Sequence, residues 1–143
     1  MEKLYLDNCC FNRPFDDQTQ TKIYIETIAK LQIQAQIIEG KYELVWSSIL
    51  EYENSQNPYA IRKENIKKWR DIATYFIKGN DSVLKKMKDY ESIGIKTKDA
   101  LHLAFAVYMD VDYFITTDKG ILNKNISEVK RMNPVDFINE KED

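Results

Sequence analysis

Three acidic residues follow apolar segments of this chain, and a fourth opens its most apolar stretch. The first three are Asp7, Glu51 and Asp118, and the fourth is Asp99. Two carboxylates about 4 Å apart repel each other by roughly 4 kcal/mol at an effective dielectric of about 20. A cluster of four therefore needs protons or cations. Oxygen ligands select hard cations such as Mg²⁺ or Mn²⁺, which can deprotonate water beside a phosphodiester. If the four acids converge, we predict metal-assisted phosphodiester hydrolysis.

Three of these acids also have an ordinary structural explanation. Asp99 follows Thr97, a good N-cap, so its charge could simply favour the first turn of a helix. Asp7 could cap the turn after a strand, and Asp118 could be a turn residue or the N-cap of a short helix. The local sequence leaves both interpretations open for each of them.

Glu51 has the strongest structural alternative. Ser48 to Glu51 matches the capping-box pattern, in which the Glu side chain reaches back to the N–H of the cap. Glu53 lies two residues further on, points to another side of the predicted helix, and is the competing candidate. His102, one turn after Asp99, could face that acid, although a buried histidine in such a helix is more often part of the core.

The elements that must position these residues alternate between strands and helices. Apolar periodicity predicts strands at 3–6, 42–46, 113–116 and 129–132, a loop at 11–18, long helices at 19–39, 59–78 and 98–109, a short helix starting at Ser48 and another within 81–95. This alternation predicts an α/β fold with a parallel sheet covered on both faces. In such sheets, sites form outside the carboxyl ends of the strands, where three of the acids lie.

Length and composition point to one domain over residues 1–143, with little room for linkers because the chain has 4 Gly and 3 Pro. The first residues do not form a signal peptide, and no apolar run approaches the roughly 18 residues of a membrane span. We therefore expect a soluble, cytoplasmic protein without a membrane association. Cys9 and Cys10 are the only cysteines, and we expect reduced thiols after the first strand.

Charge is unevenly distributed along the chain. Residues 61–98 contain eleven Lys or Arg against five Asp or Glu, although the whole chain has a net charge of −2. This favours a basic surface beside an acidic site, as a nucleic-acid enzyme needs, while the alternative is a solvated amphipathic helix. The candidate RNA-binding residues are Arg62, Lys63, Lys67, Lys68 and Arg70.

Four segments, taken in order, resemble the acidic motifs of the PIN-domain nucleases. They are Leu4-Tyr-Leu-Asp-Asn8, Ser48-x-x-Glu51, Asp99-Ala-Leu-His-Leu-Ala-Phe-Ala106 and Phe114-Ile-Thr-Thr-Asp118. The segment Asn133-Pro-Val-Asp-Phe-Ile138 also resembles the C-terminal end of that family. The resemblance spans nearly the whole chain and implies a three-layer α/β/α sandwich with a central parallel sheet.

The resemblance also implies an activity and a set of site residues. It implies Mg²⁺- or Mn²⁺-dependent cleavage of single-stranded RNA, and, as for many bacterial members, a toxin held by a small antitoxin protein; a homodimer is a further expectation. The metal-binding set would be Asp7, Glu51, Asp99 and Asp118, with Thr116 and Asn8 in support.

One position departs from the family pattern. Many members have another acid or Asn two residues after the fourth acid, where this chain has Gly120. The alternative function is therefore a PIN-fold module with weakened metal chemistry, acting in RNA binding or protein assembly. A phosphatase of the haloacid type is disfavoured, because the D-x-D motif it needs is absent at Asp7-Asn-Cys9.

Overall fold

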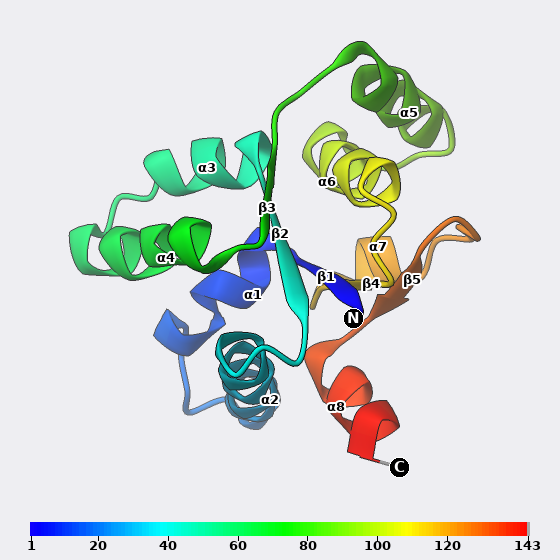
Figure 1. The fold of residues 1–143 in the computed structure, drawn as a ribbon. Coiled ribbons are helices and arrows are strands. Elements are labelled where there is room, and N and C mark those ends of the chain that lie inside the picture. Colours follow the sequence, from blue (N-terminus) through cyan, green and yellow to red (C-terminus); the bar gives the residue numbers. More distant parts are fainter. Residues whose placement is uncertain (143) are drawn as a thin grey trace.

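A five-stranded, all-parallel sheet forms the centre of the molecule (Figure 1). The structure is a computed structural model and describes residues 1–142. The strands are β1 (Lys3–Leu6), β2 (Glu43–Ser47), β3 (Tyr75–Ile77), β4 (Tyr113–Ile115) and β5 (Lys130–Met132), in the spatial order β3-β2-β1-β4-β5. The strands predicted at 3–6, 42–46, 113–116 and 129–132 are confirmed to within a residue or two. The central position of β1 places its carboxyl end, at Asp7, in the middle of the sheet edge.

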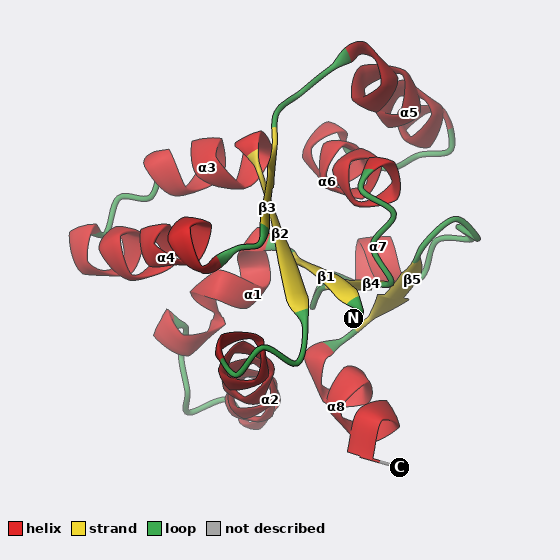
Figure 2. Cartoon of the chain, in the orientation of Figure 1, coloured by secondary structure: helices red, strands yellow, loops and turns green. Residues whose placement is uncertain are grey.

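Helices cover both faces of this sheet (Figure 2). They are α1 (Asn8–Asn12), the 3₁₀ turn η1 (Arg13–Phe15), α2 (Thr21–Ile38), α3 (Ser48–Ser55), α4 (Ala60–Ile72), α5 (Asp81–Ser92), α6 (Thr97–Tyr108), α7 (Lys119–Leu122) and α8 (Pro134–Glu142). Figure 1 shows α1, α2, α4 and α8 on one side of the sheet and α5, α6 and α7 on the other. The predicted three-layer α/β/α sandwich is therefore confirmed.

Two predicted segments have a different structure. Residues 11–18 were expected to form a loop, but α1 and η1 occupy most of them, because Asp7 caps α1 and Pro14 fits the first turn of η1. The helix expected over 59–78 ends at Ile72. After it, Tyr75–Ile77 pairs with β2 as an edge strand, in keeping with the high strand propensity of Tyr, Phe and Ile.

The apolar helix α6 packs against the sheet and under α5. Leu103 and Phe105 are fully buried, as the sequence pattern predicts for a helix that is apolar on nearly every side. On the strands beneath, the rings of Tyr5 and Phe114 stack with their centroids 5.2 Å apart. α6 is thus a rigid element that fixes the position of any side chain in its first turns. None of the described helices is both long and apolar enough to cross a bilayer.

Candidate functional site

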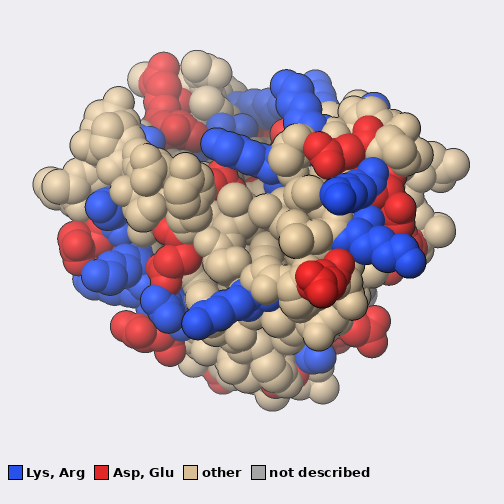
Figure 3. All heavy atoms as spheres, turned by 90° about the horizontal axis from the view of Figure 1, so that it is seen from above, with Lys and Arg blue, Asp and Glu red and all other residues tan. Residues whose placement is uncertain are grey.

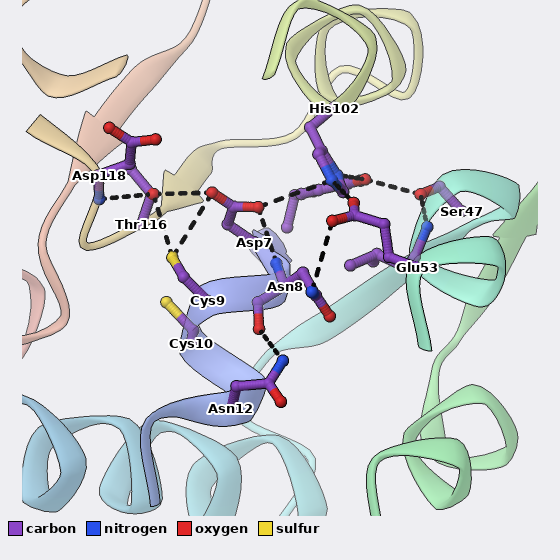
Figure 4. Close-up of polar contacts among 12 residues, drawn as sticks. Asp7, Asn8, Cys9, Cys10, Asn12, Ser47, Glu53, His102, Thr116 and Asp118 are labelled. Atoms are coloured by element: carbon purple, nitrogen blue, oxygen red, sulfur yellow. Dashed lines mark hydrogen bonds and ion pairs between the residues drawn. The ribbon is translucent and has the colours of Figure 1, made fainter. Parts of the chain in front are cut away.

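Asp7 lies at the centre of a polar cluster at the carboxyl end of β1 (Figure 4). Its side chain is almost completely buried. Its Oδ1 accepts a hydrogen bond of 2.7 Å from the backbone N–H of Asn8, and its Oδ2 accepts one of 2.9 Å from the hydroxyl of Thr116. A buried carboxylate has to be hydrogen-bonded or paired, and these donors fix its orientation.

Asp118 enters the same region from the end of β4. The hydroxyl of Thr116 accepts a 3.0 Å hydrogen bond from the Asp118 backbone N–H, so Thr116 joins the two acids. Asp118 is also the N-cap of α7, since its Oδ1 accepts a 2.7 Å hydrogen bond from the Gly120 N–H. A Cβ at Gly120 would lie only 3.0 Å from that oxygen. The close approach explains why a glycine suits the position where an acid was expected.

Asp99 projects from the first turn of α6. The N-cap of this helix is Lys96 rather than Thr97, whose hydroxyl instead donates a 2.6 Å hydrogen bond to Glu91. Asp99 lies in the first turn of α6, where the helix dipole favours a negative charge, so its ordinary structural explanation still applies. Burial, the charge of Asp118 and the charge of Asp7 raise the pKa of Asp99 to about 6. This shift means that the carboxylates of the cluster lie near enough to repel one another.

The second motif acid of the sequence, Glu51, lies outside this cluster. Its carboxylate forms an ion pair with Arg70 of α4. The capping box proposed for Ser48 and Glu51 is absent, because the N-cap of α3 is Ser47, whose hydroxyl accepts the Leu50 N–H at 3.3 Å. The N-cap thus lies one residue earlier than the S-x-x-E pattern predicts.

Glu53 occupies the position near Asp7 that was expected for Glu51. Its Oε2 accepts a hydrogen bond of 3.4 Å from the side-chain amide of Asn8, and its Oε1 is paired with Nε2 of His102. Nε2 of His102 also lies 3.7 Å from Oδ1 of Asp7. The cluster that the structure brings together therefore contains Asp7, Glu53, Asp99 and Asp118.

A buried chain of hydrogen bonds runs from this cluster into the core. Nδ1 of His102 lies 2.7 Å from the hydroxyl of Tyr5, which lies 2.6 Å from the hydroxyl of Ser47. Burial opposes the charged imidazolium, but the hydrogen bond that His102 donates to Glu53 and the charge of Asp7 outweigh it, so the pKa of His102 is raised. The histidine is thus a satisfied core residue, as its setting in the sequence favoured, and it also orients Glu53.

The chemistry of the donors fits a hard divalent cation. The acids offer oxygen ligands only, which hard divalent cations prefer; the pKa of Asp99 is raised first by burial and then by the charges of Asp118 and Asp7. Within residues 1–142, however, no three Asp, Glu, His or Cys side chains are gathered closely enough to hold one metal ion. Glu53 is occupied by His102, and Asp118 by the first turn of α7.

Two cavities flank the cluster. One, of about 220 Å³, is lined by Asp99 and Asp118 together with Lys96 and Lys124. The other, of about 500 Å³, lies over α1 and α3 and is lined by acidic Glu53 and by the cations Arg62 and Lys98, among others. Basic side chains therefore border the acids on both sides.

Three of the five residues of α4 that were predicted to bind RNA have different surroundings. Arg62 lies over the rings of Phe15 and Tyr59, at 5.2 and 4.6 Å, and borders the larger cavity. Arg70 is paired with Glu51, and Lys68 lines a different pocket between α2 and α4. On the face seen in Figure 3, acidic and basic side chains are interspersed rather than separated.

Sequence reasoning did not select three residues of this region, namely Glu53, Lys98 and His102. The sequence offers Glu53 only as an alternative to Glu51. Both residues lie on α3, and the way this helix packs decides which of them faces Asp7. Lys98 belongs to the basic segment 61–98. Its position next to Asp99 in the sequence is the signal that could have placed it beside the acids. The role of His102 depends on Tyr5, which is 97 positions away, and no local pattern shows that contact.

Comparisons with known proteins bear on the fold. Neither the protein-family models nor the curated proteins searched contain a match to this chain. Among solved structures, the chain is similar to one in the crystal structure of VapBC2 from Rickettsia felis bound to a DNA fragment from their promoter, with a TM-score of 0.58 and 13% identity. The similarity covers 92% of this chain and 98% of that one. Such a likeness concerns the fold alone, and it agrees with the three-layer α/β/α sandwich described above.

Proposed function

We propose that this protein is a metal-dependent endoribonuclease that hydrolyses phosphodiester bonds of single-stranded RNA in the cytoplasm. The observation that carries the proposal is the convergence of Asp7, Glu53, Asp99 and Asp118, from four different elements, at the carboxyl end of the central strand. Parallel α/β sheets place their sites at this edge. Glu53 takes the place that the sequence motifs assigned to Glu51.

To hold Mg²⁺ or Mn²⁺, these carboxylates would have to move closer together than they lie here, with Glu53 released from His102 and Asp118 from the first turn of α7. The bound ion would lower the pKa of a water molecule and shield the charge that develops on the phosphodiester. Thr116 and the Asn8 backbone N–H hold Asp7 in one orientation, and His102 does the same for Glu53.

The basic residues around the two cavities would bind the RNA backbone. Arg62 and Lys98 border the cavity that reaches Glu53, and Lys96 and Lys124 border the one that reaches Asp99. Cations at such positions attract phosphates and bring the chain across the acids. We therefore assign Lys98 and Lys124 to RNA binding beside Arg62, and we expect Arg70 to contribute less because Glu51 neutralises it.

A role as the toxin of a toxin–antitoxin pair is part of this proposal. It is supported by the fold shared with a chain of the VapBC2 structure. It is also supported by exposed apolar side chains on α2, since such surfaces mark protein partners. These side chains are Tyr24, Ile25, Ile28, Leu31 and Ile38. An antitoxin is the partner we favour, and a second copy of the chain is the other candidate.

The experiment that tests the proposal is cleavage of a single-stranded RNA with and without Mn²⁺. Asp7→Asn and Asp99→Asn should each abolish the Mn²⁺-stimulated cleavage while the circular dichroism spectrum stays that of the wild type. Either variant cutting at the wild-type rate would refute the site.

A matched pair within α3 tests the choice of glutamate. Glu53→Gln should lower the cleavage rate at least tenfold, because it removes a carboxylate of the cluster, whereas Glu51→Gln should change it less than threefold. The reverse order of effects would restore Glu51 as the site residue.

The second candidate function is a PIN-fold module with weakened metal chemistry. It is favoured by Gly120, which supplies no side chain where many family members carry an acid or Asn, and whose close approach to Asp118 leaves little space for one. If the addition of Mn²⁺ leaves the melting temperature of the protein unchanged, that result would support this candidate over the nuclease.

A further inference from the structure

A pocket separate from the acidic cluster lies between α2 and α4, beside α1 and η1. Its volume is about 290 Å³, at the lower end of the range for small-molecule sites, which is about 300–1,000 Å³. Figure 1 shows α1, α2 and α4 together on one side of the sheet. The walls are largely aromatic and aliphatic, and they include Phe11, Phe15, Leu31, Ile66, Trp69 and Ile72.

Two hydrogen-bond donors lie in these apolar walls without a partner. Lys30 and Gln34 are one helical turn apart on α2, so they share a face of the helix, and they are only 3% and 5% exposed. Gln34 Nε2 is buried and has no hydrogen-bond partner within residues 1–142. Nζ of Lys30 also forms no hydrogen bond or ion pair within residues 1–142. It lies 5.5 Å from the centroid of the Phe11 ring.

An unpartnered buried cation is unusual, because taking a charge out of water costs several kcal/mol unless an anion or acceptor compensates. The only titratable neighbour that affects Lys30 is Cys10, and burial together with the neighbouring Cys9 raises the pKa of that thiol, which keeps it neutral. The protein therefore supplies a positive charge and an amide N–H, but no acceptor for either of them. An anion that enters the pocket could accept hydrogen bonds from both groups.

We propose that this pocket binds a small hydrophobic carboxylate, whose carboxylate accepts hydrogen bonds from Lys30 and Gln34 and whose ring or alkyl body fills the apolar walls. Trp69 and Phe11 offer flat surfaces on which an aromatic ring can pack. The site is built from helices that do not carry the four acids, so it does not depend on the proposed nuclease activity.

The test compares two probes of equal shape, 2-naphthoate and the uncharged 2-naphthamide, by titration calorimetry and by protein NMR. The naphthoate should bind at least tenfold more tightly than the amide and should shift the Trp69 indole resonance. Equal affinities, or no binding of either probe, would overturn the proposal.

Two methionine variants identify the cation. Lys30→Met keeps the length of the side chain and removes its charge, so it should weaken naphthoate binding at least tenfold. Lys22→Met is the matched control on an exposed position of the same helix and should have no effect. Gln34→Leu should weaken binding of the carboxylate to a smaller degree. If Lys30→Met binds naphthoate as the wild type does, the assignment of Lys30 is wrong.

Discussion

At the scale of single residues, Lys30 is both a proposed ligand contact and a buried charge that lowers the stability of the folded protein. Burial lowers the pKa of this lysine from 10.5 to about 8. The unfolded chain therefore binds more protons than the native state between about pH 8 and pH 10.5, and stability rises with pH in that window. Below pH 8 the native protein carries the full cost of the buried charge, about 3 kcal/mol.

We predict that Lys30→Met stabilises the protein at pH 7 and that its advantage shrinks toward pH 10. The reason is that the variant has no buried charge to neutralise. Urea unfolding of both proteins at four pH values between 7 and 10 measures the difference. A difference in unfolding free energy that stays constant across these pH values would contradict the lowered pKa of Lys30.

The acids show how far residue types alone can be interpreted. Three of the four residues in the cluster, Asp7, Asp99 and Asp118, could be picked from the sequence because each lies at the border of an apolar element. The fourth could not, because Glu51 and Glu53 are both on α3 and differ by about 200° around the helix axis. Which of them faces Asp7 depends on how α3 docks, and long-range packing decides that.

At the scale of elements, α5 is the support of the helix that carries Asp99. α5 packs against α6, and its N-terminus is capped by Asn80, whose Oδ1 accepts the Val83 N–H at 2.9 Å. Val83 and Tyr90 are the buried side chains of α5. The stability of this helix therefore depends on one cap and a narrow apolar face.

Asn80→Ala should cost about 1 kcal/mol, because it leaves an N–H of the first turn without its acceptor. Asn80→Asp keeps an acceptor at the same place and should retain most of the stability. Urea denaturation provides both values. An aspartate variant that loses as much as the alanine variant would argue against the cap.

Helices and strands with a clear apolar pattern could be predicted from the sequence. Those that form only through contacts with another part of the chain could not. The helix α6 was found from its composition alone. The edge strand β3 was missed because Tyr75–Ile77 follows a helical pattern without a break, and only its pairing with β2 makes it a strand. α1 was missed for a similar reason, since it is one turn long and depends on its Asp7 cap.

At the scale of the whole molecule, one hydrophobic core joins the sheet to both helical layers. Phe137 of α8 is fully buried, and its ring packs edge-on against Tyr42 and Tyr113, with centroids 5.5 and 5.2 Å apart. The final helix is thus part of the core. This is the basis for treating the chain as one folding unit.

Phe137→Ala should destabilise the protein by about 3–5 kcal/mol, because it removes a large buried ring. The unfolding transitions followed by tryptophan fluorescence and by circular dichroism should shift together, since Trp46 and Trp69 belong to the same unit as α8. If the fluorescence transition stays in place while the circular dichroism transition moves, α8 unfolds separately and the single-domain prediction fails.

The hydrogen bond between Thr116 and Asp7 spans 109 positions of the chain. During synthesis Asp7 is made first, Thr116 follows 109 positions later, and β4 must then insert beside β1. Every fragment that ends before β4 lacks the Thr116 hydroxyl that orients Asp7. If the proposed nuclease site is correct, its carboxylates can therefore come together only after β4 has joined β1 in the sheet.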